Sequence, residues 1–335
     1  MKPTALTFVL LVLLVPFAGA LSLLVGGTPL SLEQIAGQLV HPHETGVLNA
    51  IVWQLRLPRV CIAATVGASL ALCGAMLQGM LRNPLVDPYL TGVSAAAAAA
   101  IAIAILAGIA APATPGIGFV AGLGAALLVA VLARRGGGID PSRLILAGVS
   151  LSTLFAAIVT LAIIRAQSND YASTIVAWLA GSMAGRGWHD LALAAPYAAL
   201  GALLALGSVG PLNALRVGEL RARAVGVDVD RAQWLILAAS SLLAASSVVL
   251  AGLVGFVGLI VPHVARRIVG TDARALLPAC VAIGAALCML ADAVCRWIVA
   301  PAELPIGVLL AFIGVPAFLY LYLRPARLLG RGTGL

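Results

Sequence analysis

Charged residues are scarce in this 335-residue chain: Asp, Glu, Lys and Arg make up only 10% of it, whereas hydrophobic residues make up 62%. A soluble domain carries about 25% charged residues. The composition therefore excludes an ordinary soluble protein and predicts an all-α polytopic membrane protein. The formal net charge of +8 comes from basic residues that stand singly or in pairs at the ends of apolar runs. This pattern argues against binding of nucleic acid.

Lysine is almost absent, and so are the motifs of hydrolytic and metal enzymes. Lys2 is the one lysine in the sequence, so no P-loop lysine exists, and His-Glu-x-x-His is missing. The five cysteines form no Cys-x-x-Cys pair, which favours small core residues over metal ligands. His41 and His43 form an isolated His-x-His, which is weak evidence for a metal site. We therefore expect no catalytic residue, no metal and no cofactor bound by this chain.

The sequence contains enough apolar runs for ten membrane spans. A bilayer core of about 30 Å needs about 20 helical residues at ~1.5 Å rise each. The predicted spans are residues 4–26, 60–81, 92–111, 117–133, 144–164, 191–209, 276–299 and 304–323, with one full and one shorter span in 232–265. Residues 171–183 are predicted to form a half-helix at the interface. Ten spans put both termini on one side, and fifteen of the twenty basic residues fall there. The positive-inside rule makes that side cytoplasmic.

Two apolar stretches cannot be regular helix. Residues 82–92 contain Pro84 and Pro88, and proline does not continue a helix interior. Residues 232–265 are uncharged, but glycines and Pro262 interrupt them. Irregular backbone at membrane depth is tolerated where it is packed in protein or lines a cavity, as in transporters with broken helices. A short surface turn is the alternative for 82–92. We expect the translocation path or its gate at Asn83, Pro84, Pro88, Gly255, Gly258 and Pro262.

The segments LRLPR and GASLALCGAMLQGMLRNPLVDPYLTGVS, within 53–94, resemble the second and third spans of the FecCD-type permeases. The resemblance continues through GFVGLIVPHVARRIVG (255–270), LPACVAIGAALCMLAD (277–292) and ELPIGVLLAFIGVPAFLYLY (303–322). These permeases are membrane subunits of bacterial ABC importers for iron-siderophores, haem and vitamin B12. The resemblance implies a single transmembrane permease domain over 1–335, in the bacterial inner membrane. It also implies a homodimer with two cytoplasmic ABC ATPase subunits that use ATP, and a periplasmic substrate-binding protein.

Arg56, Arg59 and Arg296 lie on the side of the membrane where basic residues are few. Snorkelling to lipid headgroups is one explanation. The resemblance implies another, because family arginines at these places engage glutamates on the two lobes of the binding protein. A planar guanidinium suits such carboxylate pairing. Asp292 stands four residues before Arg296 and offers it an intrahelical partner instead.

The most polar stretch, residues 212–231, lies on the cytoplasmic side in this topology. Its sequence predicts a short helix with Val217, Leu220 and Val225 as an apolar edge and Gly226 as a stop. A solvated linker is the plainer explanation, but an apolar edge favours docking to another protein. The stretch is similar to the coupling loop of the family, which inserts into a groove on the ATPase. That resemblance assigns ATPase coupling to Gly218, Glu219, Arg221, Ala224, Val225 and Gly226.

These observations predict an ABC importer permease for a bulky iron chelate. Haem is the favoured cargo, with a ferric siderophore as the alternative and vitamin B12 third. The residues do not decide among the three, because selectivity in such systems rests largely on the binding protein. Asp292 keeps a proton-coupled secondary transporter open, since acids inside membrane spans often mark proton relays. An intramembrane enzyme is a further rival, and no nucleophile–base pair supports it.

Overall fold

The computed structural model describes residues 4–323 except 27, 43–45, 110–112, 136–137, 167–168 and 301. It is mostly helical, and each predicted span contains a helix. Within the described residues, seven helices are long and apolar enough to cross a membrane. They are α1 (Ala5–Leu24), Val47–Met80, which includes α4 (Leu57–Met80), α6 (Thr114–Leu132), α7 (Pro141–Arg165), α9 (Trp188–Gly207), α12 (Val229–Ala251) and α14 (Ala273–Ile298). The remaining predicted runs hold the shorter α5 (Val93–Leu106), α13 (Val257–Val269) and α15 (Ile306–Leu323).

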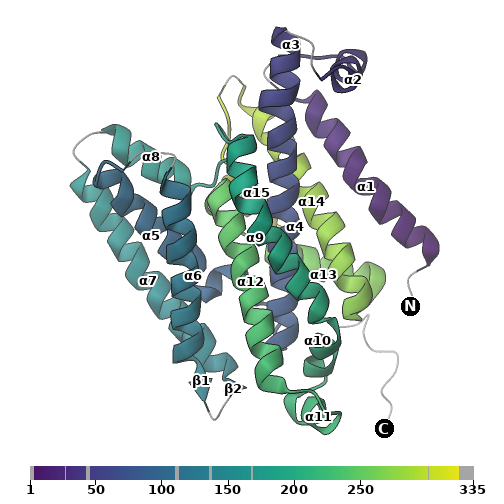
Figure 1. Cartoon of the computed structure of the whole chain (residues 1–335), viewed down its shortest axis with the longest axis vertical. Helices are drawn as coiled ribbons and strands as arrows, with labels where there is room; N and C mark the ends of the chain where they lie inside the picture. Colours follow the sequence, from purple (N-terminus) through teal and green to yellow (C-terminus); the bar gives the residue numbers. More distant parts are fainter. Residues whose placement is uncertain are drawn as a thin grey trace.

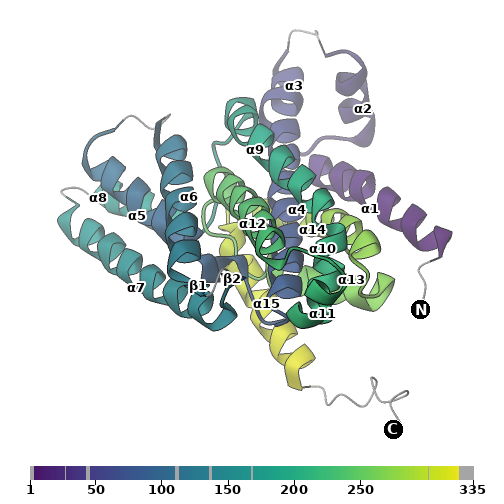
Figure 2. The same cartoon turned by 60° about the horizontal axis from the view of Figure 1, so that its bottom comes forward.

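The helices form a central group with a flank on each side (Figure 1). Helices α4, α12 and α14 stand in the middle, α1 lies on one flank, and α5, α6 and α7 lie on the other with α8 (Asn169–Leu179), as Figure 2 also shows. The short helices α2 (Leu32–Val40) and α3 (Val47–Ala50) mark one end of the molecule, called the α2 end here. Helices α10 (Val209–Arg216) and α11 (Glu219–Ala224) mark the opposite end, called the α11 end.

A two-residue hairpin at the α11 end departs from the all-α prediction. Strands β1 (Arg134–Arg135) and β2 (Gly138–Ile139) pair antiparallel, with Arg134 opposite Ile139. The side chain of Gln233 holds this hairpin on α12, because its Oε1 accepts the Ile139 amide at 2.8 Å. Two residues per strand are too few to show a period in the sequence, so the pattern of residues alone did not indicate strands.

Helix α4 is the packing centre of the fold, and glycines allow its close contacts. A β-carbon on Gly67 would collide with the carbonyl of Gly284 in α14, and one on Gly74 would collide with the carbonyl of Gly258 in α13. Lipid tails are as apolar as side chains, so helices in membranes associate largely through such close van der Waals contact. Small residues pack closely in α5 as well, where Ala96 to Ala99 of the alanine run 95–100 are buried.

The second predicted span begins earlier than the sequence indicated. Helix α3 continues through a π-helical turn, η1 (Ile51–Arg56), into α4, so one helix runs from Val47 to Met80. Pro58 therefore lies inside a longer helix, although it directly precedes the predicted span 60–81. The π-turn offers a physical reason: Leu57 donates its amide to Val52, one residue further back than in an α-helix. This register shift accommodates the amide hydrogen that Pro58 lacks.

Both predicted breaks are present. A turn and the 3-10 helix η2 (Pro88–Thr91) follow α4, and residues 252–256 separate α12 from α13. Gly252 and Phe256 take up positive φ values of 68° and 66° there. The breaking residues are only partly those predicted, because Gly258 and Pro262 lie inside α13.

The close approach at Gly74 predicts a position-specific response to a single added methyl group. Gly74→Ala should lower the melting temperature or the yield of folded protein, because its β-carbon meets rigid backbone of α13. Overpacking of this kind costs about 1–3 kcal/mol or more. Gly124→Ala in α6 is the matched control, since nothing lies within 4 Å of its β-carbon position. The two variants are compared by thermal unfolding in detergent, and equal melting temperatures would contradict the packing described.

Candidate functional sites

Asp292 is the centre of a buried ion-pair cluster between α4 and α14, toward the α2 end. Its carboxylate is 1% exposed and lies between two guanidinium groups. Arg59 donates to it through Nε at 3.0 Å and Nη2 at 2.9 Å, and Arg296 donates through Nε at 3.0 Å. Arg59 also pairs with the half-exposed Glu303 at 2.8 Å. The intrahelical pair that the spacing of Asp292 and Arg296 suggested is therefore formed.

Arg56 and Arg296 cap the C-terminal end of α1. The last carbonyl groups of a helix have no partner within it. Arg56 donates to the carbonyls of Leu23 and Leu24, and Arg296 donates to those of Ser22, at 2.8 Å, and Val25. The cations thus meet the negative end of the α1 dipole. The excess of positive charge in the cluster is balanced in this way by backbone carbonyls.

The three predicted docking arginines therefore lie together, but two of them are not presented to a partner. Arg56 and Arg296 are only 5% and 7% exposed, and every contact described above is within the chain. This burial also excludes lipid snorkelling as the reason for their presence. Arg59 with Glu303 forms the accessible edge of the cluster. Docking by these residues stays a prediction, and it now centres on Arg59.

The loop at the α11 end has the predicted short helix and the predicted apolar edge. Helix α11 ends before Gly226, whose φ of 82° is the left-handed conformation that glycine favours at a helix stop. Val217, Leu220 and Val225 are all exposed, and Leu220 is 85% exposed. Such an apolar edge on a polar loop marks an interaction surface more often than a lone exposed leucine does.

Polar contacts to α12 hold this loop in place. Glu219 accepts a hydrogen bond from Gln233 of α12 at 3.2 Å, and Arg223 pairs with Asp230 at 3.0 Å. Gly218 and Glu219 are half-buried. The other predicted coupling residues are exposed and lie beside the apolar edge: Arg221, Ala224, Val225 and Gly226. The structure thus brings this predicted group together on α11 and the residues directly beside its two ends.

The predicted path residues fall into two groups. Pro88, Gly258 and Pro262 are buried where the break after α4 meets α13, and Gly255 lies beside the ring of Tyr89. The remaining two belong to the turn that directly follows α4. In that turn the Asn83 side chain accepts the Leu85 amide at 2.9 Å, and Pro84 is exposed. Because the turn after α4 ends in buried residues, 82–92 is more than a surface turn.

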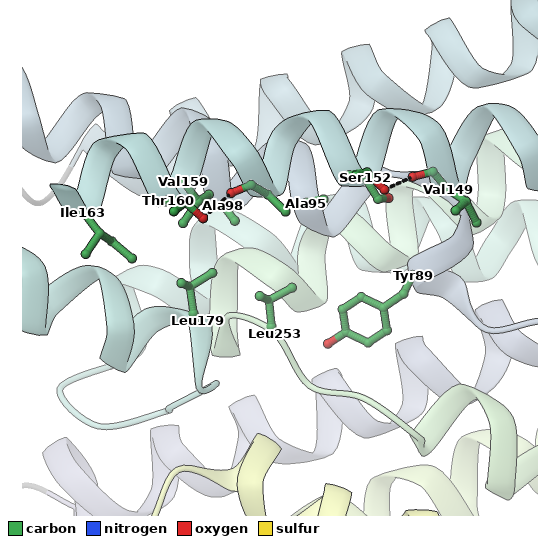
Figure 3. A pocket seen from close by; sticks show the side chains of 12 residues that line it. Tyr89, Ala95, Ala98, Val149, Ser152, Val159, Thr160, Ile163, Leu179 and Leu253 are labelled. Atoms are coloured by element: carbon green, nitrogen blue, oxygen red, sulfur yellow. Dashed lines mark hydrogen bonds between the residues drawn. The ribbon is translucent and has the colours of Figure 1, made fainter. Parts of the chain in front are cut away.

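A cavity of about 480 Å³ adjoins this meeting point (Figure 3). Tyr89 and Leu253 from the two breaks form part of its wall, and α5, α7 and Leu179 of α8 form the rest. Its polar groups are few. The hydroxyls of Thr153 and Thr160 donate back to carbonyls of their own helix at 3.0 Å. The Ser152 hydroxyl also lines the cavity and has no hydrogen-bond partner among the described residues, so the wall is mostly but not wholly apolar.

Two residues at this meeting point escaped prediction, Gln78 and Tyr89. Gln78 is 3% exposed, and its amide nitrogen donates to the carbonyls of Val86 and Gly258. A lone amide within the apolar run 60–81 was an available signal, since polar groups in membrane spans face protein partners. In the part of the chain that the structure describes, no group of three or more His, Cys, Asp or Glu side chains is placed to hold a metal. His43 lies outside the described residues.

The burial of Asp292 predicts a strong response to its neutralisation. Asp292→Asn leaves Arg59 and Arg296 without their shared anion, and removing one partner of a buried pair costs about 3–5 kcal/mol. We expect a clear loss of melting temperature and of folded yield in detergent. Glu303→Gln is the matched control, because a half-exposed pair contributes about 0–1 kcal/mol. Similar losses for the two variants would show that the cluster does not hold α1, α4 and α14 together.

The chain is similar to known transport proteins. The family model of the FecCD transport family matches residues 11–324. The cobalamin import system permease protein BtuC of Halobacterium salinarum is 39% identical over 278 residues, which cover 82% of this chain and 73% of that protein. The Fe(3+)-citrate import system permease protein YfmD of Bacillus subtilis is 36% identical over 271 residues, covering 81% and 80%.

A solved structure has the same fold. It is an inward-facing conformation of a metal-chelate type ABC transporter, 34% identical, with a TM-score of 0.86 over 96% of this chain and 99% of the other. The relatives are permease subunits, so this chain is a multi-pass membrane permease and not itself an enzyme; ATP hydrolysis belongs to a separate subunit. The family resemblance noted in the sequence is thereby confirmed, and the chain belongs to the FecCD transport family of ABC importer permeases.

Proposed function

We propose that this chain, as a homodimer, forms the path for a bulky metal chelate through the bacterial inner membrane. The permease is a single membrane domain over 1–335 with ten spans and both termini in the cytoplasm. Two cytoplasmic ATPase subunits bind at the α11 end, and a periplasmic binding protein delivers the cargo at the α2 end. The likeness to a metal-chelate transporter over nearly the whole chain supports this assembly.

The observation that carries the proposal is the exposed apolar edge of the α11 loop. It stands at the end that is rich in basic residues, which is the cytoplasmic end by the positive-inside rule. Val217, Leu220 and Val225 would enter a groove of the ATPase as apolar anchors do at helix-in-groove interfaces. Closure of the two ATPases around ATP would then displace this loop. The broken segments and the mostly apolar cavity beside them would supply the path.

The outer docking site is proposed at the edge of the ion-pair cluster. A carboxylate on the binding protein would compete with Glu303 for Arg59, whose guanidinium is the accessible one. Arg56 and Arg296 would support this contact from within by fixing α1 against α4 and α14. Charge pairing of this kind mainly fixes register and speeds encounter.

Haem is the proposed cargo, with a ferric siderophore as the alternative and vitamin B12 third. Two relatives with similar identity are named as importers of different chelates, cobalamin and ferric citrate, so permeases of this family carry cargo of varied shape. Competition separates the candidates: unlabelled haem, a ferric siderophore and vitamin B12 are each added in excess to an uptake assay with labelled haem and the cognate binding protein. If only unlabelled haem suppresses the uptake of labelled haem, haem is supported as the cargo. If another chelate suppresses it, that chelate replaces haem as the proposed cargo.

The proton-coupled rival finds little support in the structure. A proton carrier needs an acid that changes its protonation during the cycle. Asp292 instead accepts hydrogen bonds from Arg59 at 2.9 Å and Arg296 at 3.0 Å, which give this acid a structural role between α4 and α14. The test is uptake into proteoliposomes that contain the permease, the ATPase and ATP, with a proton uncoupler present. Uptake should persist with the uncoupler and cease without ATP. Uptake that needs a pH gradient and ignores ATP would establish the rival.

The apolar edge predicts a defect confined to ATPase coupling. Leu220→Ser removes the most exposed anchor, so less ATPase should co-purify, while the melting temperature of the permease stays within about 1–2 °C of the wild-type value because the residue is exposed. Leu32→Ser in α2 is the matched control: the same change at an exposed leucine on a short helix at the opposite end. Normal ATPase recovery with Leu220→Ser, or an equal loss with Leu32→Ser, would contradict the assignment.

A further inference from the structure

Pro262 leaves one carbonyl of α13 without its helical donor. In an α-helix the amide of residue 262 would donate to the carbonyl of residue 258. Proline has no amide hydrogen, and Pro262 stands inside α13 rather than in its first turn. Gly258 and Pro262 are both buried. A buried carbonyl without a donor is costly where no water reaches it, so this position needs a hydrogen bond from elsewhere.

The side chain of Gln78, from α4, supplies that hydrogen bond. Its Nε2 lies 3.0 Å from the carbonyl oxygen of Gly258 and 3.1 Å from that of Val86. Both neighbours are acceptors, so the nitrogen and not the oxygen of the amide must face them. Each of its two hydrogens therefore satisfies one irregular position: the proline-containing turn of α13 and the break after α4. The Oε1 atom of Gln78 is buried and has no donor among the described residues.

The packing around this amide is equally close. A β-carbon on Gly258 would lie 2.6 Å from Cδ of Pro88 and 3.0 Å from the carbonyl oxygen of Leu70. Helix α4, the break and α13 thus meet around one side chain. We define this meeting point as the Gln78 joint, made of Gln78, Val86, Pro88, Gly258 and Pro262.

The Gln78 joint lies next to the elements that carry the coupling loop. One residue beyond Gln78, a β-carbon on Gly79 would lie 2.7 Å from Cδ1 of Leu212 in α10. Slightly further along, a β-carbon on Gly218 would lie 3.7 Å from Nη1 of Arg82. The same stretch of chain that meets α13 therefore also contacts α10 at Leu212 and lies beside Gly218, which directly precedes α11. On its other side, α13 follows directly on the 252–256 break, part of which borders the cavity.

We propose that Gln78 is a positioning residue for energy coupling. Its amide joins α4, the break after α4 and the proline-containing turn of α13, so that a displacement of the α10–α11 loop moves the start of α13 and the adjoining break as one unit. This inference rests on the proposed function of the chain. It adds a residue that contacts neither the ATPase nor the cargo.

A double-mutant cycle tests the joint on the purified permease alone. Gln78→Met keeps the length of the side chain but removes both hydrogen bonds, and it should lower the melting temperature by about 3 °C. Pro262→Ala returns an amide donor to Gly258, so Gln78→Met should cost clearly less in that background. Gln54→Met is the matched control: it changes an exposed glutamine of the same continuous helix and should leave the melting temperature unchanged. No loss with Gln78→Met, or the same loss in both backgrounds, would overturn the joint.

The coupling role has its own measurement, the number of chelate molecules imported per ATP hydrolysed in proteoliposomes. This ratio should fall about fivefold with Gln78→Met and recover in the double variant, because one buried hydrogen bond is worth about that factor. An unchanged ratio would overturn the coupling role even if the stability cycle shows the joint. Where Gln78→Met alone does not fold, folding of the double variant supports the joint and its failure contradicts it. A wild-type complex without ATP-driven uptake would overturn the proposed function instead.

Discussion

The close approach of α4 to its neighbours is the constraint on which the rest of the structure depends. Gly67 and Gly74 let the backbones of α14 and α13 touch α4 directly, where any β-carbon would collide with a carbonyl group. Between apolar helices in an apolar solvent, this contact replaces the burial of hydrophobic surface that holds soluble proteins together. It also brings the irregular positions of three helices within reach of a few polar side chains on α4.

Two polar side chains near the two ends of α4 donate to carbonyls that other segments leave unpaired. Arg56, directly before α4, donates to carbonyls that α1 leaves unpaired where it stops. Gln78, near the other end of α4, donates to carbonyls that a proline and a break leave unpaired. In lipid an unpaired carbonyl is costly, so each break in a helix must be met by a donor from elsewhere in the protein. The end of α1, the break after α4 and the proline-containing turn of α13 are thereby fixed by side chains of one continuous helix.

Much of this arrangement was predictable from the sequence, and the failures have physical causes. Apolar runs, the two breaks and the apolar edge around Leu220 follow from local composition and spacing, so the sequence indicated them. The burial of Arg56 does not, because its partners are carbonyls some 30 residues away along the chain, which no pattern reveals. Likewise Gly258 and Pro262 suggested a helix break, yet α13 continues through both, since Gln78 replaces the missing donor. Hydrogen bonds between residues far apart in the sequence account both for the burial of Arg56 and for the continuity of α13.

We propose that a separate ATPase binds the chain at its α11 end and powers transport from there. Site-specific photocrosslinking tests it most directly, with a photoreactive amino acid at position 220 or at position 32 of the permease in native membranes. The account predicts a crosslink from 220 to the ATPase subunit and none from 32, because Leu220 and Leu32 are exposed at opposite ends of the molecule. A crosslink to the ATPase from 32, with none from 220, would invert the topology and contradict the account.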